Sequence, residues 1–367
     1  MKRMCILSAL VFLAACSCGG GKDEPAVETD TVKTTPEALS FMAEGETLTL
    51  GVTAGGSFQV YCDADWVTVD LSFVKASSGS VSVTVKENMQ YEERKAEVVV
   101  KCGTVRHKVA LTQAAATSPS IVSPDGYKLV WNDEFDKAGA PSNEWSYETG
   151  NGNGGWGNNE VQYYVPCSVE GTQLATVSGG TLKIKAQKIG GTVYSIRMNT
   201  TQSWTYGWFE AKLKVTDVPG SWPAFWMMPK NFNSWPRDGE VDIMEYAIST
   251  QGKDKSSSSI HCDAYNHLNS TGKTHVQPVS NAATEFHVYA CEWTKDGFKF
   301  YIDGKLHHSF ANDGKGNYST WPFYNPFYLK LNLAWGGNMG IGPNKKPDDS
   351  LLPAVYEIDY VRVFQKK

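Results

Sequence analysis

Alternation of apolar and polar residues in short runs is the feature that most limits the folds open to this chain. Residues 47–50, 81–85, 181–185 and 208–215 all alternate in this way. Successive side chains of a strand point to opposite faces, so a period of two is typical of half-buried strands. We find no strong amphipathic helical pattern of 12 or more residues. The sequence therefore predicts an all-β protein.

The length of 367 residues suggests at least two domains. Residues 116–124 are small residues with two prolines and predict a linker. Residues 37–115 hold short alternating runs separated by glycines, which predict a small Ig-like β-sandwich. Residues 125–367 are long enough for a second, larger β-sandwich or jelly roll.

The N-terminus is typical of an export signal. Lys2 and Arg3 precede an apolar stretch at residues 6–15, which is too short to span a bilayer. Small residues then lead into Cys16, an ending that resembles a bacterial lipoprotein signal. We expect residues 1–15 to be removed and Cys16 to carry the lipid; ordinary secretory cleavage is the alternative.

The segment that follows, residues 16–36, is polar, acidic and rich in glycine, which predicts a flexible tether. It resembles the tethers of Bacteroidetes-type surface lipoproteins. We therefore expect an outer-membrane lipoprotein exposed at the cell surface, with a periplasmic location as the alternative. The formal charge of −5 argues against a nucleic-acid partner, and we expect a monomer.

Six cysteines remain after Cys5 and Cys16 are set aside, and they show no metal-ligand spacing. Cys262 and Cys291 lie in two strand-like runs that could pair. A disulfide between them and two buried free thiols are both open on the sequence.

Three acids within six positions carry the chemistry. Glu240 and Asp242 share one face of a strand, whereas Glu245 would point to the other face of a regular strand. One extra residue, a β-bulge, would bring all three to one face. Like charges so close raise at least one pKa, which meets the need of retaining glycoside hydrolysis for one ionised and one protonated carboxyl. An exposed acidic strand and a calcium site are the alternatives.

Residues 240–245 resemble the catalytic signature of glycoside hydrolase family 16, in its laminarinase-like branch with the bulge. Segments 131–135, 155–162, 206–211 and 356–363 resemble other motifs of the family, in the same order. The resemblance implies a concanavalin-like β-jelly-roll sandwich with an open cleft. It also implies roles for the acids: Glu240 as nucleophile, Asp242 as its helper and Glu245 as acid/base. No cofactor is expected for catalysis.

The N-terminal sandwich resembles the BACON domain of carbohydrate enzymes. The matching residues are at positions 65–67, Asn88, Arg94, 96–100 and 111–113. The resemblance implies either glycan binding or a rigid spacer. We favour the spacer, because a single tryptophan, Trp66, is a poor sugar platform.

Aromatic residues make up 12% of the chain, and 11 of its 12 tryptophans follow residue 124. Flat indoles can stack on sugar rings, although core packing is the usual role of a tryptophan. With the resemblance, the candidate substrate-binding residues are Trp222, Trp226, Trp156, Asn158, Glu160, Arg197, Trp235 and His261. The resemblance also implies a structural calcium ion held by Glu134, Asp359 and the carbonyl of Gly180.

The expected substrate is a β-1,3-glucan or a mixed-linkage β-1,3/1,4-glucan, cut within the chain. The charged pair at 237–238 and the long polar stretch 265–275 depart from the laminarinase pattern. They leave open an endo-β-galactosidase acting on mucin-type or keratan-like chains. A non-catalytic glycan-binding protein is the alternative of another class, and the presence of all three acids argues against it.

Overall fold

The computed structural model describes residues 31–88, 93–115 and 121–367. The predicted signal peptide, Cys16 and residues 17–30 of the predicted tether lie outside the described residues. Within them, no helix is long and apolar enough to cross a membrane. The described chain is almost entirely strands and divides into two compact units, so the predicted all-β class is confirmed.

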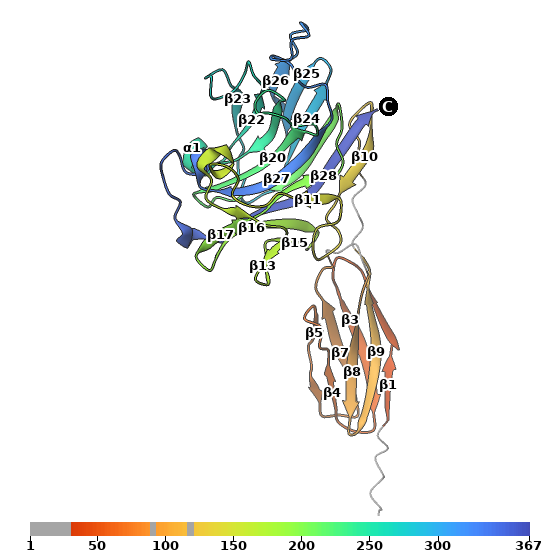
Figure 1. Ribbon diagram of the computed structural model, residues 1–367. Coiled ribbons are helices and arrows are strands. Elements are labelled where there is room, and N and C mark those ends of the chain that lie inside the picture. The colour runs from red at the N-terminus through yellow and green to blue at the C-terminus, as the bar shows by residue number, and fades with distance from the viewer. Residues whose placement is uncertain (1–30, 89–92, 116–120) are drawn as a thin grey trace, which may run out of the picture. The chain divides into compact units, whose positions relative to one another are not determined.

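The strands β1 to β9 form a two-sheet N-terminal sandwich (Figure 1). One sheet has the order β1-β3-β7-β5 and the other the order β2-β9-β8-β4-β6. Alternate residues of the long strands are buried, as in β8 and β9. The strands are β1 (Val32–Thr35), β2 (Ala38–Phe41), β3 (Thr47–Ala54), β4 (Phe58–Tyr61), β5 (Val67–Val69), β6 (Phe73–Val74), β7 (Ser78–Val85), β8 (Arg94–Cys102) and β9 (Val105–Gln113).

The first strand corrects the predicted end of the tether. Residues up to 36 were expected to be flexible, yet Val32 pairs with Ala54 and Thr35 with Gly51 in an antiparallel ladder. Thr34 is buried in this strand. The strand is only four residues long and contains one apolar side chain, so its composition resembles that of the polar tether before it.

Three residues of the BACON resemblance interlock the loops at one end of this sandwich. Gln113 Nε2 donates to the carbonyl of Met42 at 2.9 Å and to that of Lys86 at 3.0 Å. Arg94 Nε donates to Gln113 Oε1 at 2.8 Å, and Asn88 Nδ2 donates to the carbonyl of Ala114 at 2.8 Å. Buried backbone carbonyls thus obtain their hydrogen bonds from side chains.

Two large sheets form the C-terminal unit (Figure 1), as expected for a jelly-roll sandwich. The ten-stranded sheet has the order β12-β17-β16-β28-β19-β24-β25-β26, with β10 paired to β28 and β15 to β16. Its strands are β10 (Tyr127–Asp133), β12 (Tyr163–Tyr164), β15 (Ala175–Ser178), β16 (Thr181–Ile189), β17 (Thr192–Ser195), β19 (Gly207–Lys214), β24 (His287–Thr294), β25 (Gly297–Ile302), β26 (Lys305–Ala311) and β28 (Ala354–Lys366).

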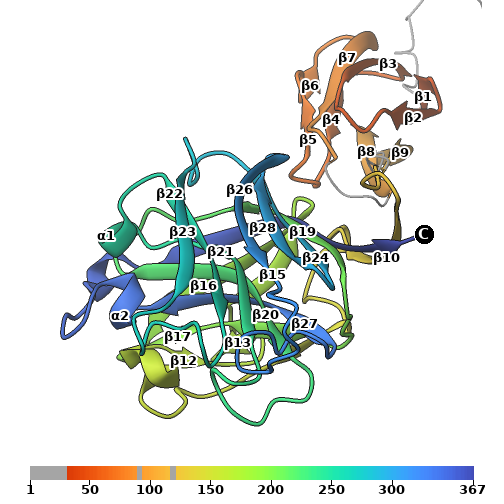
Figure 2. The ribbon, with the colours of Figure 1, turned by 90° about the horizontal axis from the view of Figure 1, so that it is seen from above.

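The seven-stranded sheet has the order β11-β18-β27-β20-β21-β22-β23. Its strands are β11 (Trp145–Tyr147), β18 (Arg197–Thr200), β20 (Ser221–Pro229), β21 (Glu240–Glu245), β22 (Lys255–His261), β23 (Lys273–Pro278) and β27 (Phe327–Trp335). A two-stranded ribbon joins β13 (Ser168–Val169) and β14 (Thr172–Gln173), and the helical turns are η1 (Gly155–Asn159), α1 (Ile248–Gln251), α2 (Gly337–Gly340) and η2 (Asp349–Leu351). The short helices α1 and α2 lie at the same end of the unit (Figure 2).

Apolar side chains of both sheets form one core, which includes Phe209, Leu331 and Val361. Cys262 and Cys291 belong to this core and are free thiols, so the disulfide alternative is wrong. The Cys262 thiol donates instead to the carbonyl of Thr320, at 3.7 Å. Burial raises the pKa of both thiols and disfavours the reactive thiolate.

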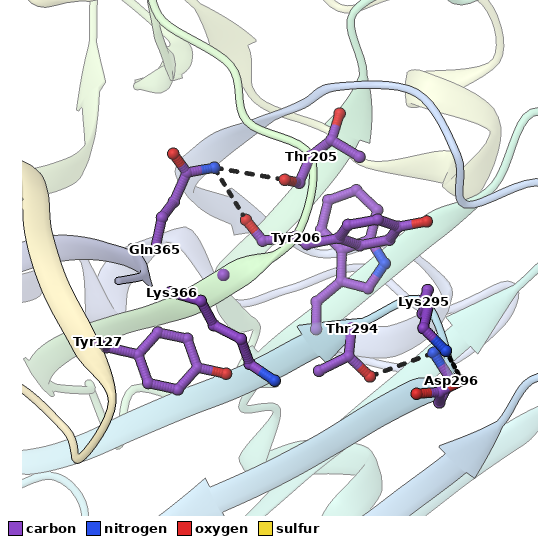
Figure 3. Close-up of a pocket in the computed structure, with 10 residues that line it drawn as sticks. Tyr127, Thr205, Tyr206, Thr294, Lys295, Asp296, Gln365 and Lys366 are labelled. Carbon is purple, nitrogen blue, oxygen red and sulfur yellow. Dashed lines mark hydrogen bonds and ion pairs between the residues drawn. The ribbon is translucent and has the colours of Figure 1, made fainter.

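A cavity of about 450 Å³ lies among strand ends of the ten-stranded sheet (Figure 3). Tyr127, Tyr206, Thr294 and Lys366 line it, and the side chain of Gln365 donates to the carbonyls of Thr205 and Tyr206 nearby. None of the residues that line this cavity belongs to the sheet that carries the three acids. The catalytic chemistry therefore has to be sought elsewhere.

Candidate active site

The strand β21 contains the predicted bulge. Trp226 of β20 pairs with Asp242, and the preceding residue, Phe225, pairs with Met244, so Ile243 is one extra residue. Ile243 and Met244 are both buried in the core, and so is Val241. Two successive residues thus point into the core, which reverses the parity of the strand after the bulge.

The bulge brings the three acids to one face of the seven-stranded sheet, which we call the acid face. Asp242 is 4% exposed, whereas Glu240 and Glu245 are half-buried at the surface. On the next strand, His261 pairs with Glu240, and its Nε2 lies 3.1 Å from Asp242 Oδ2 and 3.9 Å from Glu240 Oε1. The predicted catalytic acids and His261 are therefore brought together.

Burial and mutual repulsion change the ionisation of both glutamates. Burial and the charge of Asp242 raise the pKa of Glu240 to about 7, against the opposing effect of His261 and Arg197. The same two causes raise the pKa of Glu245 to about 8. Both glutamates therefore ionise at higher pH than a solvent-exposed carboxyl, so one of the pair can keep a proton near neutral pH, as an acid and a nucleophile on one site require.

His261 supplies positive charge to this cluster. Burial opposes the charged imidazolium, but the hydrogen bond to Asp242 and the charges of the three acids raise the pKa of His261 to about 9. Within the described residues, only Glu240, Asp242 and His261 bring three Asp, Glu, His or Cys ligand atoms within 4.8 Å of one another. The three acids favour the protonated form of His261, and a metal ion bound here would have to displace that proton.

Two predicted tryptophans lie on the acid face with polar partners. Trp222 Nε1 donates to Glu245 Oε1 at 3.1 Å, so this indole contacts the predicted acid/base directly. Trp226, directly opposite Asp242, donates to Asn332 Oδ1 at 2.6 Å. Both side chains are half-buried, which leaves part of each ring open to a sugar.

Arg197 of β18 joins the site through an ion pair. Its Nε lies 2.6 Å from Glu148 Oε2, and its guanidinium lies over the rings of Trp156 and Trp226, at 4.3 and 4.9 Å from their centroids. These distances are in the range of cation–π contacts. The other oxygen of Glu148 accepts from Lys330, so one carboxylate holds two cations.

Glu160 lies beside this cluster and is almost fully buried. Gln162 Nε2 donates to it at 2.7 Å and the Tyr164 hydroxyl at 3.2 Å. Asn158 Nδ2 reaches it at 3.5 Å. Burial raises the pKa of Glu160, although Arg197 and these hydrogen bonds oppose the rise. Glu160, a predicted site residue, is therefore buried and holds its neighbours by hydrogen bonds.

A glycine-rich loop holds Trp156 over Arg197. Gly155 adopts a φ of 60°, and a Cβ there would lie 2.4 Å from the backbone of Glu160. Trp156 itself has a φ of 56°, in the left-handed region that side chains other than glycine seldom adopt. The chain can fold back on itself here only because glycine occupies position 155.

Trp235 lies on the other side of the acids. Its ring centroid is 5.9 Å from that of His261 and 5.1 Å from that of His267. His267 is exposed, and its ring meets His261 edge-on at 5.7 Å. These three rings form an aromatic group beside Glu240, and His267 is a member that the sequence analysis did not name.

Other residues of the site were missed as well. Five further residues contact predicted site residues: Glu148 contacts Arg197, Lys330 and Asn332 contact Trp226, and Gln162 and Tyr164 contact Glu160. One signal was available: Lys330 and Asn332 interrupt the apolar run of β27 two positions apart, which places them on one face. Nothing local in the sequence distinguishes Glu148.

The predicted calcium site does not fit the side chains as they lie. Arg362 donates to both oxygens of Glu134, at 2.9 and 2.7 Å. Asp359 is paired with Lys212 Nζ at 2.6 Å. A calcium ion needs several free oxygen ligands, whereas each of these carboxylates already has its own cation.

Comparison with known proteins agrees with this geometry. A model of the family described as glycosyl hydrolases family 16 matches residues 161–362. The chain belongs to glycosyl hydrolase family 16. A model described as a viral BACON domain matches residues 31–116, which agrees with the early start of the N-terminal sandwich.

Three relatives of this family 16 chain are informative. A β-glucanase of Rhodothermus marinus is 38% identical over 257 residues, covering 65% of this chain and 85% of that protein. The solved laminarinase of Rhodothermus marinus is 38% identical with a TM-score of 0.60, covering 66% of this chain and 98% of that one. A keratan-sulfate endo-1,4-beta-galactosidase of Sphingobacterium multivorum is 32% identical over 256 residues, covering 67% of this chain and 57% of that protein.

Family membership makes the chain a retaining glycoside hydrolase. Retaining hydrolysis needs one carboxylate that attacks the anomeric carbon and forms a glycosyl-enzyme ester, the role predicted for Glu240. It also needs a group that protonates the leaving oxygen and later takes a proton from the attacking water, the role predicted for Glu245. Asp242 and His261 lie beside Glu240, where a carboxylate and an imidazolium can position it and share its proton.

Proposed function

We propose that this family 16 enzyme is an endo-acting β-glucanase that cuts β-1,3 or mixed-linkage β-1,3/1,4-glucans. The observation that carries the proposal is the bulged strand β21, on which Glu240 and Glu245 flank Asp242 while Trp222 and Trp226 lie beside them. Relatives named as a β-glucanase and a laminarinase, both 38% identical, support the choice of glucan.

An endo-β-galactosidase is the second candidate. The galactosidase relative, 32% identical, supports it. So does the stretch between β22 and β23, where His267 joins the aromatic group with Trp235 and His261. Galactose differs from glucose at one hydroxyl, so a small change beside the acids could select between them.

A product screen tests the proposal. The enzyme would be incubated with laminarin, lichenan, barley mixed-linkage glucan, keratan and mucin O-glycans, and the products read by mass and chromatography. We expect glucose-based oligosaccharides of several lengths. Cleavage of keratan or mucin chains alone would replace the glucanase with the galactosidase. Binding of a glycan without any product would favour the non-catalytic alternative.

The cellular part of the proposal is that Cys16 anchors the enzyme to the outer membrane, with its active site at the cell surface. The apolar stretch followed by Ala14, Ala15 and Cys16 supports it. Metabolic labelling with a fatty acid tests the anchor: the wild-type chain should be labelled and Cys16→Ala should not. Protease added to intact cells tests the exposure, since a periplasmic enzyme would survive.

A further inference from the structure

Lys330 carries its ammonium group at a buried position, where a charge is unfavourable unless it is paired. It lies in the middle of β27 and is 1% exposed. Residues directly opposite each other on paired strands share a face. Lys330 pairs with Trp226 of β20, and Trp226 pairs with Asp242 of β21, so the lysine lies in the same cross-strand row as the catalytic acids. Two strand spacings separate it from Asp242, about 10 Å.

The contacts of Lys330 connect it to the sugar-facing residues. Its Nζ donates to Glu148 Oε1 and, at 2.7 Å, to Asn199 Oδ1. The rings of Trp226 and Tyr328 lie 4.9 and 5.2 Å from the same nitrogen. The ammonium group is thus enclosed by two hydrogen-bond acceptors and two aromatic faces, and it has no surface left to contact a substrate.

Charge on this side of the acid face depends on pH. Glu148 contributes one negative charge and Arg197 one positive charge. Burial and the charge of Arg197 lower the pKa of Lys330 to about 7, so Lys330 adds a second positive charge below that pH. Glu160 also faces Arg197, and burial raises its pKa. The charged groups around Glu240 are Asp242 and Glu245 on its own strand, His261 on β22, and Arg197 and Lys330 on β18 and β27. The positive charges of Arg197 and Lys330 both lower the pKa of Glu240, against the effect of burial and of Asp242.

We infer that Lys330 is a positioning residue for the reaction: it fixes Glu148 so that Arg197 lies across Trp156 and Trp226, and its charge favours the ionised, nucleophilic form of Glu240. The inference rests on the proposed glycosidase activity and adds to it a residue that does not touch the sugar. Lys330 thus has two effects that can be measured independently: one on the position of Arg197 and one on the ionisation of Glu240.

The test compares Lys330→Met with Lys212→Met. Both changes remove one positive charge, but Lys212 lies on the ten-stranded sheet, paired with Asp359. Without the Lys330 charge, Glu240 should ionise at higher pH. The acidic limb of the kcat/KM profile, measured on the glycan that the wild-type enzyme cleaves, should therefore move up by about 0.5 to 1 pH unit. Lys212→Met should leave it in place.

A double variant distinguishes charge from position. Lys330→Met with Glu148→Gln again leaves Arg197 with one uncancelled positive charge, so the acidic limb should return toward that of the wild type. KM should stay raised, on the order of tenfold, because Arg197 has lost its carboxylate partner. Lys330→Gln, which can still donate to Glu148, is the substitute if the Met variant does not fold.

One readout needs no substrate. The ¹³C titration of the Glu240 carboxyl, assigned with Glu240→Gln, should shift upward in Lys330→Met by the same amount as the acidic limb. The inference is overturned if Lys330→Met lowers only the thermal midpoint and moves neither the titration nor the limb. If the titration shifts but the enzyme cleaves none of the tested glycans, the role of Lys330 in the ionisation of Glu240 stands and the proposed function is wrong.

Discussion

At the scale of single residues, the two glutamates of β21 have different surroundings, which agrees with the different roles predicted for them. Glu240 lies next to His261 and Asp242, whereas Glu245 accepts a hydrogen bond from the indole of Trp222. Burial and mutual repulsion raise the pKa values of Glu240 and Glu245 to about 7 and about 8, so the pair loses its protons in two steps near neutral pH. Activity as a function of pH should be bell-shaped, with its maximum where the pair holds one proton.

Substitution of the two glutamates should give different chemical signatures. We expect Glu240→Gln to lower kcat by about 10³-fold or more while glycan binding persists, because the nucleophile is lost but the aromatic residues remain. Glu245→Ala should lose comparable activity toward substrates whose leaving group needs a proton. Turnover of an activated aryl glycoside and the structure of its products measure both effects.

Azide gives the control for this assignment. In Glu245→Ala it can replace the water that no longer has a base, which should restore turnover and yield a β-glycosyl azide. In Glu240→Ala it would attack the sugar from the vacant side and yield an α-glycosyl azide. The opposite pairing of products with variants would exchange the two roles.

The hydrogen bond from Trp222 should tune the acid. Its N–H stabilises the ionised form of Glu245, so Trp222→Phe, which keeps an aromatic face, should raise the pKa of Glu245 further. The basic limb of the kcat/KM profile should then move up by about 0.5 to 1 pH unit. Trp226→Phe is the matched control, since that indole donates to Asn332 and not to an acid. Equal shifts in both variants would contradict the argument.

Residues of the site differ in how far the sequence could predict them. Glu240, Asp242 and Glu245 lie within six positions, so their proximity is a local property of one strand. Glu148, by contrast, meets Lys330 across 182 positions of the chain. Long-range pairing of charges depends on the register between strands, which alternation alone does not determine. The family resemblance predicted Arg197 as a site residue, but it did not predict Glu148, the ion-pair partner of Arg197.

At the scale of elements, the bulge in β21 decides which face each acid occupies. Deletion of Ile243 should restore regular alternation and still leave Glu245 on the acid face, because only one of two core-facing residues is removed. We expect this variant to lose about 2 to 4 kcal/mol of stability from the missing buried side chain. Its kcat should fall by about 10²-fold, since Glu245 moves nearer to Asp242. Thermal unfolding and initial rates measure these effects.

Insertion of one alanine after Met244 is the counterpart. It would turn Glu245 toward the core, where an unpaired carboxylate is unfavourable. We expect this variant to lose all measurable activity and more stability than the deletion. If the deletion and the insertion were equally inactive, the face to which Glu245 points would not be what the bulge determines.

Alternation predicted the strands better than it predicted their ends. The apolar residues of β16 and β19 are buried as the pattern requires. The strand β1 was missed because a four-residue strand with one apolar side chain has no pattern to detect. The turn at 155–159 could not be predicted either, since its path depends on backbone conformations that only its glycines permit.

The whole molecule combines a catalytic sandwich with an N-terminal sandwich that has its own sheets and its own core. No described sheet takes strands from both sandwiches. The motif residues of the N-terminal sandwich, Gln113, Arg94 and Asn88, are occupied by hydrogen bonds that hold its loops. Its single tryptophan, Trp66, is half-buried. These features favour the predicted spacer role over a surface arranged for sugar stacking.

Removal of that spacer should leave the chemistry intact. We expect a chain that begins at residue 121 to keep kcat/KM on soluble glycan within about twofold, because every residue of the active site comes from the C-terminal unit. The isolated segment 31–115 should not be retarded in affinity gels that contain laminarin or mucin. The full chain and the shorter chain should also act equally on insoluble glycan in free solution, where a spacer has no membrane to clear. A selective loss on insoluble glycan, on the order of tenfold, would instead assign glycan binding to the N-terminal sandwich, since a tethered binding module raises the local substrate concentration only on surfaces.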